Sequence, residues 1–402
     1  MYLAQFGSGA GQGGGDILGA IIPSAMFLLL FFYPRIAFSL QMMPALSRVA
    51  DDLDALSRKG RKIVLREISA KPDRKTEESL DRFFEFFTIM PVDLDSFGII
   101  RKIEHVIQQQ KQRFDLFSSH LVPKADAEKK ANITMGLAGG ISLYGLSKMV
   151  RHFVEMTRKT KSFYFAMALQ MQLPMIEKAA KALYRGTKAL SRGWPIGDGI
   201  GPLVVARMMG NSKTKLVEED TIMARKKLKG RNVYLIKAKG PGGRLGRPGK
   251  ALESLSKKIQ IDKIITVDAA GKLEGEKTGT LAEGIGVAMG GIGVEKSYIE
   301  DVAVQNRIPF DAVVVKMSHE QAISPMRKRI KDSIPKVIES IERMADETKK
   351  HDANIAIIGV GNTSGVGNSI SEAEKAFKWI DTYEKRYKER MKNQKKKKRF
   401  RL

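Results

Sequence analysis

The stretch 261–291, IDKIITVDAAGKLEGEKTGTLAEGIGVAMGG, decides the fold class expected for the second half of the chain. It opens with the apolar, mostly β-branched run 264–267, which is typical of a buried parallel strand. Asp268 follows, and a segment rich in glycine with Glu274 and Glu276 comes next. Ligands of open α/β sheets bind outside the carboxyl ends of the strands, so these acids mark a candidate site. An ordinary turn stabilised by the Asp268 side chain is the alternative interpretation.

Outward from this stretch, short apolar runs alternate with helical patterns. We expect strands at 233–238, 264–267, 312–317 and 354–358, and helices near Pro202 and at 250–258, 294–305, 326–349 and 371–389. A basic segment, 213–229, is also expected to be helical. Strands that alternate with helices predict a three-layer α/β domain at 191–384, with a mostly parallel sheet and helices on both faces.

Composition excludes several classes of site. The chain has 402 residues, enough for two domains, and a net charge of +26 that favours anionic partners. It has no cysteine, which excludes disulfides, thiolate metal sites and cysteine nucleophiles. The five histidines are scattered, so a histidine-rich metal cluster is not expected.

The amino end combines a flexible, glycine-rich leader, 1–16, with an apolar run at 17–34. This run predicts an uncleaved transmembrane helix, with membrane lipid as its partner. A cleaved signal peptide is the alternative, but it needs a basic segment in front and small residues at the cleavage site. Positive residues such as Arg35 and Arg48 follow the run. The sequence therefore predicts a single-pass protein of the cell membrane, with its amino terminus outside and its C-terminal domain cytoplasmic.

Residues 35–190 show the apolar period of helices and contain few proline or glycine residues. Two apolar stretches, 133–146 and 162–176, are short for membrane spans. A span by both would also place several basic residues outside, against the orientation rule. We expect them to be core helices or helices at a membrane surface.

The chain ends in a basic tail, 385–402, with eleven Lys or Arg and one Glu. Such blocks are usually disordered, and this one is expected to contact anionic lipid, RNA or an acidic protein.

Two loops rich in glycine are candidates for binding an anion. The first is 238–249; the second, 359–368, follows a strand and precedes a helix. The second loop does not match a known phosphate-binding motif, because no Lys-Ser/Thr pair follows it and the GxGxxG pattern fails at Ser364. Tight turns at strand ends are the alternative. The candidate ligand-binding residues are Gly240, Gly242, Gly243, Arg244, Arg247, Gly359, Gly361, Thr363 and Gly365.

Two short motifs suggest remote relatives of the α/β half. These are Asp198-Gly-Ile-Gly-Pro202 at a helix start and Thr266-Val267-Asp268-Ala269 at a strand end. Together with the glycine-rich segments and Ile308-Pro309, they resemble the germination protease of bacterial spores and the hydrogenase maturation endopeptidases. Over its whole length the chain resembles an uncharacterised family of archaeal membrane-anchored proteins, a domain of unknown function.

The order of these motifs departs from that of the proteases. In those enzymes a strand that ends in Gly-x-Gly-Asn precedes the first acid, whereas here that motif is Gly359-Val-Gly-Asn362 near the other end of the chain. We therefore expect a permuted sheet in which the C-terminal strand brings Asn362 close to Asp198.

Three functions follow as hypotheses. The resemblance implies a peptidase-like hydrolase with Asp198 and Asp268 as acid and base, Glu274 and Glu276 as substitute acids, and Asn362 as an oxyanion donor. Asp198, Asp268 and Glu274, without histidine, would suit a hard cation such as Mg²⁺, and the sequence identifies no cofactor beyond this. The alternatives are a module that binds a nucleotide or phosphate ligand, and a scaffold that recruits RNA or acidic partners. The sequence specifies neither substrate nor oligomeric state.

Overall fold

The computed structural model describes residues 26–27, 38–91, 98–287 and 293–399. The chain divides into two compact units. Unit 1 comprises Met1–Asp54 and Ser147–Glu177, and unit 2 comprises Ala55–Leu146 and Lys178–Leu402. Three long helices pass from one unit to the other. These helices are α2 (Met43–Ile68), α5 (Ala127–Thr160) and α6 (Phe163–Ser191).

Unit 1 consists of the first part of α2, the end of α5 and the start of α6, preceded by the π-helical turn η1 (Phe38–Met42). Arg151 joins α5 to α2, because its guanidinium contacts Asp54 at 2.6 Å and Asp51 at 2.5 Å, and both carboxylates lie on α2. Buried apolar side chains from both helices lie beneath this ion pair. They are Leu46, Ala50, Leu53, Val150 and Val154.

The helical part of unit 2 adds α3 (Arg74–Phe84) and α4 (Ile99–Leu121) to the remaining parts of the long helices. Asp73 begins α3, because its side chain accepts a hydrogen bond of 2.9 Å from the Thr76 N–H. The apolar faces of these helices form one core. Its buried members are Val64, Leu65, Leu80, Phe84, Phe114, Ile133 and Leu137. The expected helical region is therefore present wherever the structure describes it.

The rest of unit 2 is built on one seven-stranded sheet with the order β1-β2-β3-β7-β4-β6-β5. Pairings β3–β7, β7–β4 and β4–β6 are parallel, whereas β1–β2, β2–β3 and β5–β6 are antiparallel. The sheet is therefore mixed, which corrects the predicted mostly parallel one. The strands are β1 (Thr214–Glu218), β2 (Thr221–Leu228), β3 (Arg231–Ala238), β4 (Lys263–Gly271), β5 (Leu281–Ile285), β6 (Phe310–Met317) and β7 (Asn354–Gly359).

Two antiparallel regions explain the difference. The segment 213–229, expected to be helical, forms the hairpin of β1 and β2, in which Asp220 has a φ of 52° and Ile222 and Ala224 are buried. Its many lysines conceal this alternation in the sequence. The edge strand β5 is half-buried or exposed throughout, so it has no apolar run to reveal it.

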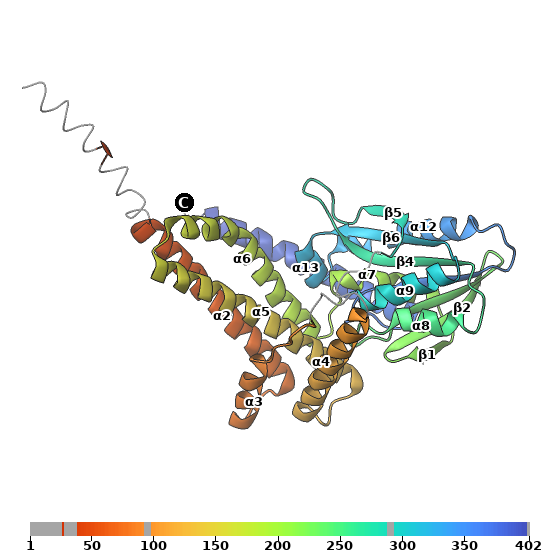
Figure 1. Cartoon of the computed structure of the whole chain (residues 1–402), viewed down its shortest axis with the longest axis horizontal. Helices are drawn as coiled ribbons and strands as arrows, with labels where there is room; N and C mark the ends of the chain where they lie inside the picture. Colours follow the sequence, from red (N-terminus) through yellow and green to blue (C-terminus); the bar gives the residue numbers. More distant parts are fainter. Residues whose placement is uncertain (1–25, 28–37, 92–97, 288–292, 400–402) are drawn as a thin grey trace, which may run out of the picture. The chain divides into compact units, whose positions relative to one another are not determined.

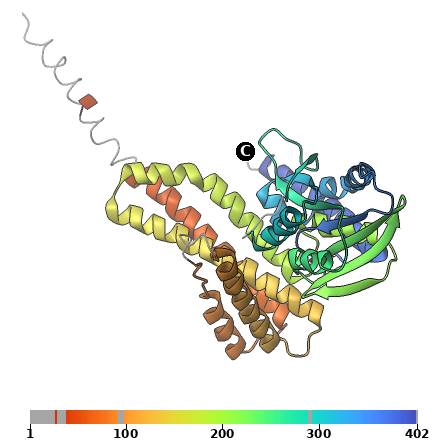
Figure 2. The same cartoon turned by 45° about the vertical axis from the view of Figure 1, so that its right-hand side comes forward.

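Helices cover both faces of the sheet (Figures 1 and 2). On one face, α7 (Ile200–Met209), α12 (Ile334–Asp346) and α13 (Ile370–Arg399) share a core with Ile265, Val267 and Ile357. On the other, α8 (Pro248–Ser256) and α9 (Val294–Gln305) pack against Ile264 and Ile358. Short helices complete the domain. They are η2 (Gly197–Gly199), α10 (His319–Ile323) and α11 (Lys328–Lys331), so the helix expected at 326–349 is divided.

The C-terminal helix also corrects the sequence-based expectation. The tail was expected to be disordered from residue 385, yet α13 continues as one helix to Arg399. Its first turns are fixed to the sheet by Ala373, Ala376 and Ile380, which are buried in the core. The basic segment is therefore a helical extension of the α/β domain.

The membrane prediction is contradicted. Across the part of the chain that the structure describes, no helix combines the length and the apolar character that a membrane crossing requires. The apolar stretch 133–146 lies within α5, and 162–176 lies within α6 except for its first residue, so this finding covers both helices. The predicted transmembrane segment, 17–34, lies outside the described residues apart from Met26 and Phe27. The structure therefore does not support the predicted single-pass topology or the predicted localisation in the cell membrane.

Candidate functional site

Strands β3 and β7 end side by side at one edge of the sheet, next to β4, which continues beyond them to Gly271. In the pairing register Gly359 of β7 lies opposite Lys237 of β3 and Val267 of β4. The loops that follow β3 and β7 cover this edge. We call the strand ends together with loops 239–247 and 360–369 the carboxyl edge. It is where an α/β sheet usually holds its ligands, and most of the predicted site residues lie on it.

Asp198 and Asn362 meet at the carboxyl edge although 164 positions separate them. The backbone N–H of Asn362 donates a hydrogen bond of 2.8 Å to Oδ2 of Asp198. Gly361 makes this approach feasible, because its φ is +130° and a Cβ there would lie 2.0 Å from the carbonyl oxygen of Asp198. The proximity expected from the permuted order of motifs is therefore confirmed.

Burial raises the pKa of the half-buried Asp198 carboxyl, and the Asn362 N–H opposes that rise. Desolvation is thus the largest influence on the pKa of the Asp198 carboxyl, and it acts upward.

Asp268 occupies a different position from the one expected. It lies within β4, which continues to Gly271, and its side chain is 3% exposed. Val267 packs in the core that contains α7, so strand alternation directs Asp268 to the opposite face, where α8 and α9 lie. Asp198 leads into α7. The two backbones therefore share the carboxyl edge, and the pairing of their carboxyl groups stays a prediction.

The substitute acids lie outside the carboxyl edge. Glu276 pairs with Lys316 and accepts a hydrogen bond of 2.7 Å from the Leu273 N–H, which together lower its pKa. Glu274 is exposed in the same turn. No group of three or more His, Asp or Glu side chains suited to a metal ion occurs within the described ranges. A Mg²⁺ site made by Asp198, Asp268 and Glu274 is therefore not assembled there.

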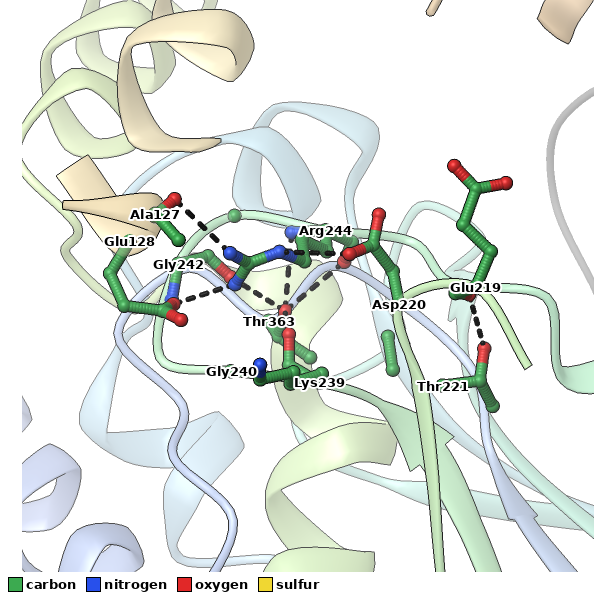
Figure 3. Close-up of polar contacts among 12 residues, drawn as sticks. Ala127, Glu128, Glu219, Asp220, Thr221, Lys239, Gly240, Gly242, Arg244 and Thr363 are labelled. Carbon is green, nitrogen blue, oxygen red and sulfur yellow. Dashed lines mark hydrogen bonds and ion pairs between the residues drawn. The ribbon is translucent and has the colours of Figure 1, made fainter. Parts of the chain in front are cut away.

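Arg244, a predicted ligand-binding residue, is held between two carboxylates (Figure 3). Its Nη1 lies 2.6 Å from Glu128, at the start of α5, and its Nε lies 3.2 Å from Asp220 in the β1–β2 turn. The side chain is only 10% exposed. Thr363 completes the arrangement, because its hydroxyl accepts from the Arg244 N–H and lies 2.8 Å from the Gly242 carbonyl oxygen.

Arg247 is held in the same way by a second set of partners. Its guanidinium pairs with Glu104 of α4 and with Glu295 of α9, the latter at 3.2 Å. Burial raises the pKa of Glu104, but hydrogen bonds from Lys250, Arg247 and Tyr298 outweigh it and lower the pKa to about 2. Both arginines of the first loop therefore bind protein carboxylates and join the helical part of unit 2 to the sheet.

Four glycine N–H groups of the two loops donate hydrogen bonds within the protein. Gly243 donates to Asn132 Oδ1 at 3.0 Å, Gly240 to Asn368 Oδ1 at 2.9 Å and Gly365 to the Pro241 carbonyl at 2.9 Å. The Gly242 N–H donates to Glu128. Gly359 ends β7 against α7, where a Cβ would lie 2.5 Å from the Gly201 oxygen. This arrangement agrees with the alternative interpretation, in which the glycines make tight turns and close contacts.

The sequence reasoning missed Lys237, the last but one residue of β3. Its side chain is fully buried, and Nζ donates to the Ala238 carbonyl at 2.7 Å and to Asn368 Oδ1 at 3.0 Å. Burial lowers its pKa to about 7, against the opposing attraction of Glu372 and Glu128. The sequence does contain a signal that could have revealed this residue, namely a lysine at a core-facing position of an otherwise apolar strand.

The fold is that of a helical region joined to an α/β domain on a mixed sheet. Two family models match the chain. The model described as "Protein of unknown function (DUF1512) N-terminal domain" covers residues 20–193, and "Domain of unknown function (DUF1512) C-terminal" covers residues 196–367. The chain belongs to this DUF1512 family of unknown function.

No curated protein and no solved structure matches the chain. The expected archaeal source and the relationship to the two protease families gain no support from these comparisons, and they stay predictions.

Proposed function

We propose that this protein binds RNA through the basic part of helix α13. The observation that carries the proposal is that 385–399 continues a helix whose first turns are buried against the sheet. Ten basic residues and one glutamate lie along this segment. A helix fixed to a folded domain holds its charges at set spacings, and so it presents them to a polyanion with less loss of conformational entropy than a disordered tail.

Two further features favour RNA over an acidic protein as the polyanion. The whole chain carries a net charge of +26, an electrostatic footprint typical of nucleic-acid binding. In addition, Trp379 and Tyr383 precede the basic segment on the same helix, and Tyr387 lies within it. Aromatic rings among cations suit nucleic acid, because bases stack on them and carboxylate side chains do not.

Binding of single-stranded RNA by the full chain tests the proposal. Fluorescence anisotropy with a labelled oligouridylate would be measured at several salt concentrations. The quadruple variant Lys385→Gln, Arg386→Gln, Lys388→Gln and Lys392→Gln removes four exposed cations from α13. We expect the slope of log K against log salt to fall by about 3, since each phosphate contact on a single strand contributes about 0.7.

The matched control removes four exposed lysines elsewhere on unit 2, namely Lys213, Lys258, Lys336 and Lys349. This control keeps the same net charge, so it should retain the slope of the wild-type protein. Equal weakening by both variants would mean that only total charge matters and would contradict the proposal. Binding to polyglutamate with no binding to RNA would identify an acidic protein as the partner instead.

Amide hydrolysis is a second candidate function, favoured by the contact between Asp198 and Asn362. A carboxyl with a raised pKa beside a backbone N–H donor is suited to supply a proton to a leaving group. Asp268 would serve as the base that activates water. The reaction would therefore need both acids at the carboxyl edge.

A mixture of internally quenched peptides tests this second function on the full chain. Asp198→Asn and Asp268→Asn should each abolish cleavage. Asp301→Asn removes an exposed carboxylate on α9 and should leave the rate unchanged. The candidate is rejected if the wild-type chain cleaves nothing or if Asp198→Asn retains full activity.

A further inference from the structure

Four aromatic rings form a continuous column where α13 meets the end of α6. Trp194 lies 5.2 Å from Trp379, Trp379 stacks on Tyr383 at 5.2 Å and 9°, and Tyr383 lies 6.3 Å from Tyr387, all between ring centroids. The last three rings recur every four residues and so occupy one face of α13. All four side chains are half-buried. We call this set the aromatic column.

Cations surround the column. The Nζ of Lys188 lies 5.6 Å from the Trp194 centroid, and Arg185 precedes Lys188 by three residues on α6. Arg390 follows Tyr387 by three residues on α13. We call Arg185, Lys188 and Arg390 the cationic rim. None of the three forms an ion pair with a carboxylate among the described residues, although Arg185 donates to the Ser324 hydroxyl at 3.3 Å.

Two other cations at the column differ, because they are neutralised. Arg192 lies 5.3 Å from the Trp194 centroid and pairs with Glu67 at 2.8 Å. Arg327 lies 3.9 Å from the Tyr387 centroid and contacts both oxygens of Glu384, at 2.8 and 2.9 Å. Carboxylates thus neutralise Arg192 and Arg327, whereas no described carboxylate forms an ion pair with the cationic rim.

The rim cations repel one another. Burial lowers the pKa of Lys188, and the nearby charges of Arg192 and Arg390 lower it further. Like charges held close together destabilise the protein unless an anion binds between them. Packing explains the rings, since Trp379 also contacts the core of the sheet domain, but it does not explain an excess of positive charge around them.

We infer that the cationic rim binds the phosphates of single-stranded RNA while its bases stack against the aromatic column. This inference rests on the proposed function. It adds that the RNA is single-stranded and names the residues that contact it. Rings that accept any base and cations that follow the backbone are the features by which proteins bind single strands with little sequence preference. A duplex keeps its bases stacked inside, so it would gain only the phosphate contacts.

The protein carries its own reporter for this site. It has two tryptophans, Trp194 and Trp379, and both belong to the aromatic column. Titration of the full chain with oligouridylate should quench the intrinsic tryptophan fluorescence, because stacked bases perturb the rings. Inorganic polyphosphate of similar charge should bind with much less quenching, and an RNA duplex should resemble polyphosphate.

Two variants separate the contributions of rim and column. Arg185→Ala with Lys188→Ala should lower the salt slope by about 1.4, which corresponds to two phosphate contacts. Tyr383→Leu with Tyr387→Leu keeps apolar packing but removes two rings. It should weaken single-strand binding about tenfold, leave polyphosphate binding unchanged, and retain the circular dichroism and melting profile of the wild-type protein. Lys336→Ala with Lys349→Ala matches the charge of the first variant and should have little effect.

The outcomes distinguish this inference from the proposed function. Absence of RNA binding by the wild-type chain removes both. If RNA binds and the α13 lysines matter, but neither double variant changes affinity or quenching, the proposed function stands and this inference is wrong. Equal quenching by polyphosphate, or equal affinity for duplex and single strand, also overturns it. Selective loss of single-strand affinity in the tyrosine variant, with quenching by oligouridylate alone, supports it.

Discussion

The carboxyl edge and the cationic rim use positive charge in opposite ways. At the carboxyl edge Arg244 and Arg247 each contact two carboxylates, and Lys237 is buried among carbonyl and amide oxygens. At the rim no described carboxylate pairs with the cations. Cations with internal partners hold a fold together, whereas cations without them are available to an external anion.

Each of the two loop arginines has one carboxylate partner from a distant part of the sequence. Glu128 precedes Arg244 by 116 residues, and Glu104 precedes Arg247 by 143. A loop with glycines and arginines resembles an anion site in the sequence, but carboxylates from the helical part of unit 2 occupy its arginines. Four measurements can sharpen or break this comparison between the two regions.

The largest effect is expected from Lys237. Its folded pKa of about 7 lies below the unfolded value of 10.5, so between these pH values the unfolded chain binds one more proton. The stability of the wild-type protein relative to Lys237→Met should therefore rise with pH, by roughly 1.4 kcal/mol per pH unit over that window. Urea unfolding of both proteins from pH 7 to 10 measures this, and parallel pH profiles would show that Lys237 is not desolvated.

Arg244→Met should have the next largest effect. It leaves Glu128 and Asp220 without their shared cation in a partly buried site, which should cost about 3 kcal/mol in the free energy of unfolding. Urea unfolding at neutral pH measures the change. Lys229→Met serves as the control, because it removes an exposed cation that also pairs with an acid, Asp346. Similar small losses in both variants would mean that the Arg244 contacts are as weak as surface ion pairs.

Glu104→Gln should destabilise the protein by about 2 kcal/mol at neutral pH, because Arg247 and Lys250 lose a charged acceptor. The folded pKa of Glu104 is about 2, below its ordinary 4.5. Its contribution is therefore complete above pH 4.5 and disappears as the pH falls toward 2. The difference between wild type and variant should shrink across this window in acid titrations followed by circular dichroism. A constant difference would assign the effect to packing alone.

Lys188→Met should have the smallest effect, within about 0.5 kcal/mol of the wild-type stability. The side chain lies in the cationic rim, so its removal breaks no ion pair and relieves repulsion from Arg192 and Arg390. Urea unfolding in low salt, where such repulsion is least screened, measures the change. A loss as large as that of Arg244→Met would show that Lys188 has a structural role and would end the contrast between the two regions.

Periodicity and local motifs determined much of the α/β fold. The expected helix 294–305 has the observed bounds of α9, and the strands at 233–238, 312–317 and 354–358 lie within β3, β6 and β7. These elements were predictable because their apolar side chains face one core and so repeat at the period of the element. The hairpin of β1 and β2 was not, since the consecutive basic residues Arg225, Lys226 and Lys227 hide the alternation.

The candidate site was predictable only in part. The resemblance to the proteases implied that the Gly-x-Gly-Asn strand end lies beside the acid at the helix start, and Asn362 does contact Asp198. It did not reveal that Asp268 lies within its strand, because the point where β4 ends depends on its pairing with β6 up to Met317.

By itself, the sequence determined the strong positive charge, the absence of thiol chemistry, the helical region and the run of strands and helices. Only the tertiary structure decided which cations are neutralised. Ion pairs form between groups a few ångströms apart in space, and one partner each of Arg244 and Arg247 lies more than a hundred positions away in the chain. The same reason separates the arginines of the glycine loop, which pair with carboxylates of the protein, from the cations of the cationic rim, which form no ion pair with a described carboxylate.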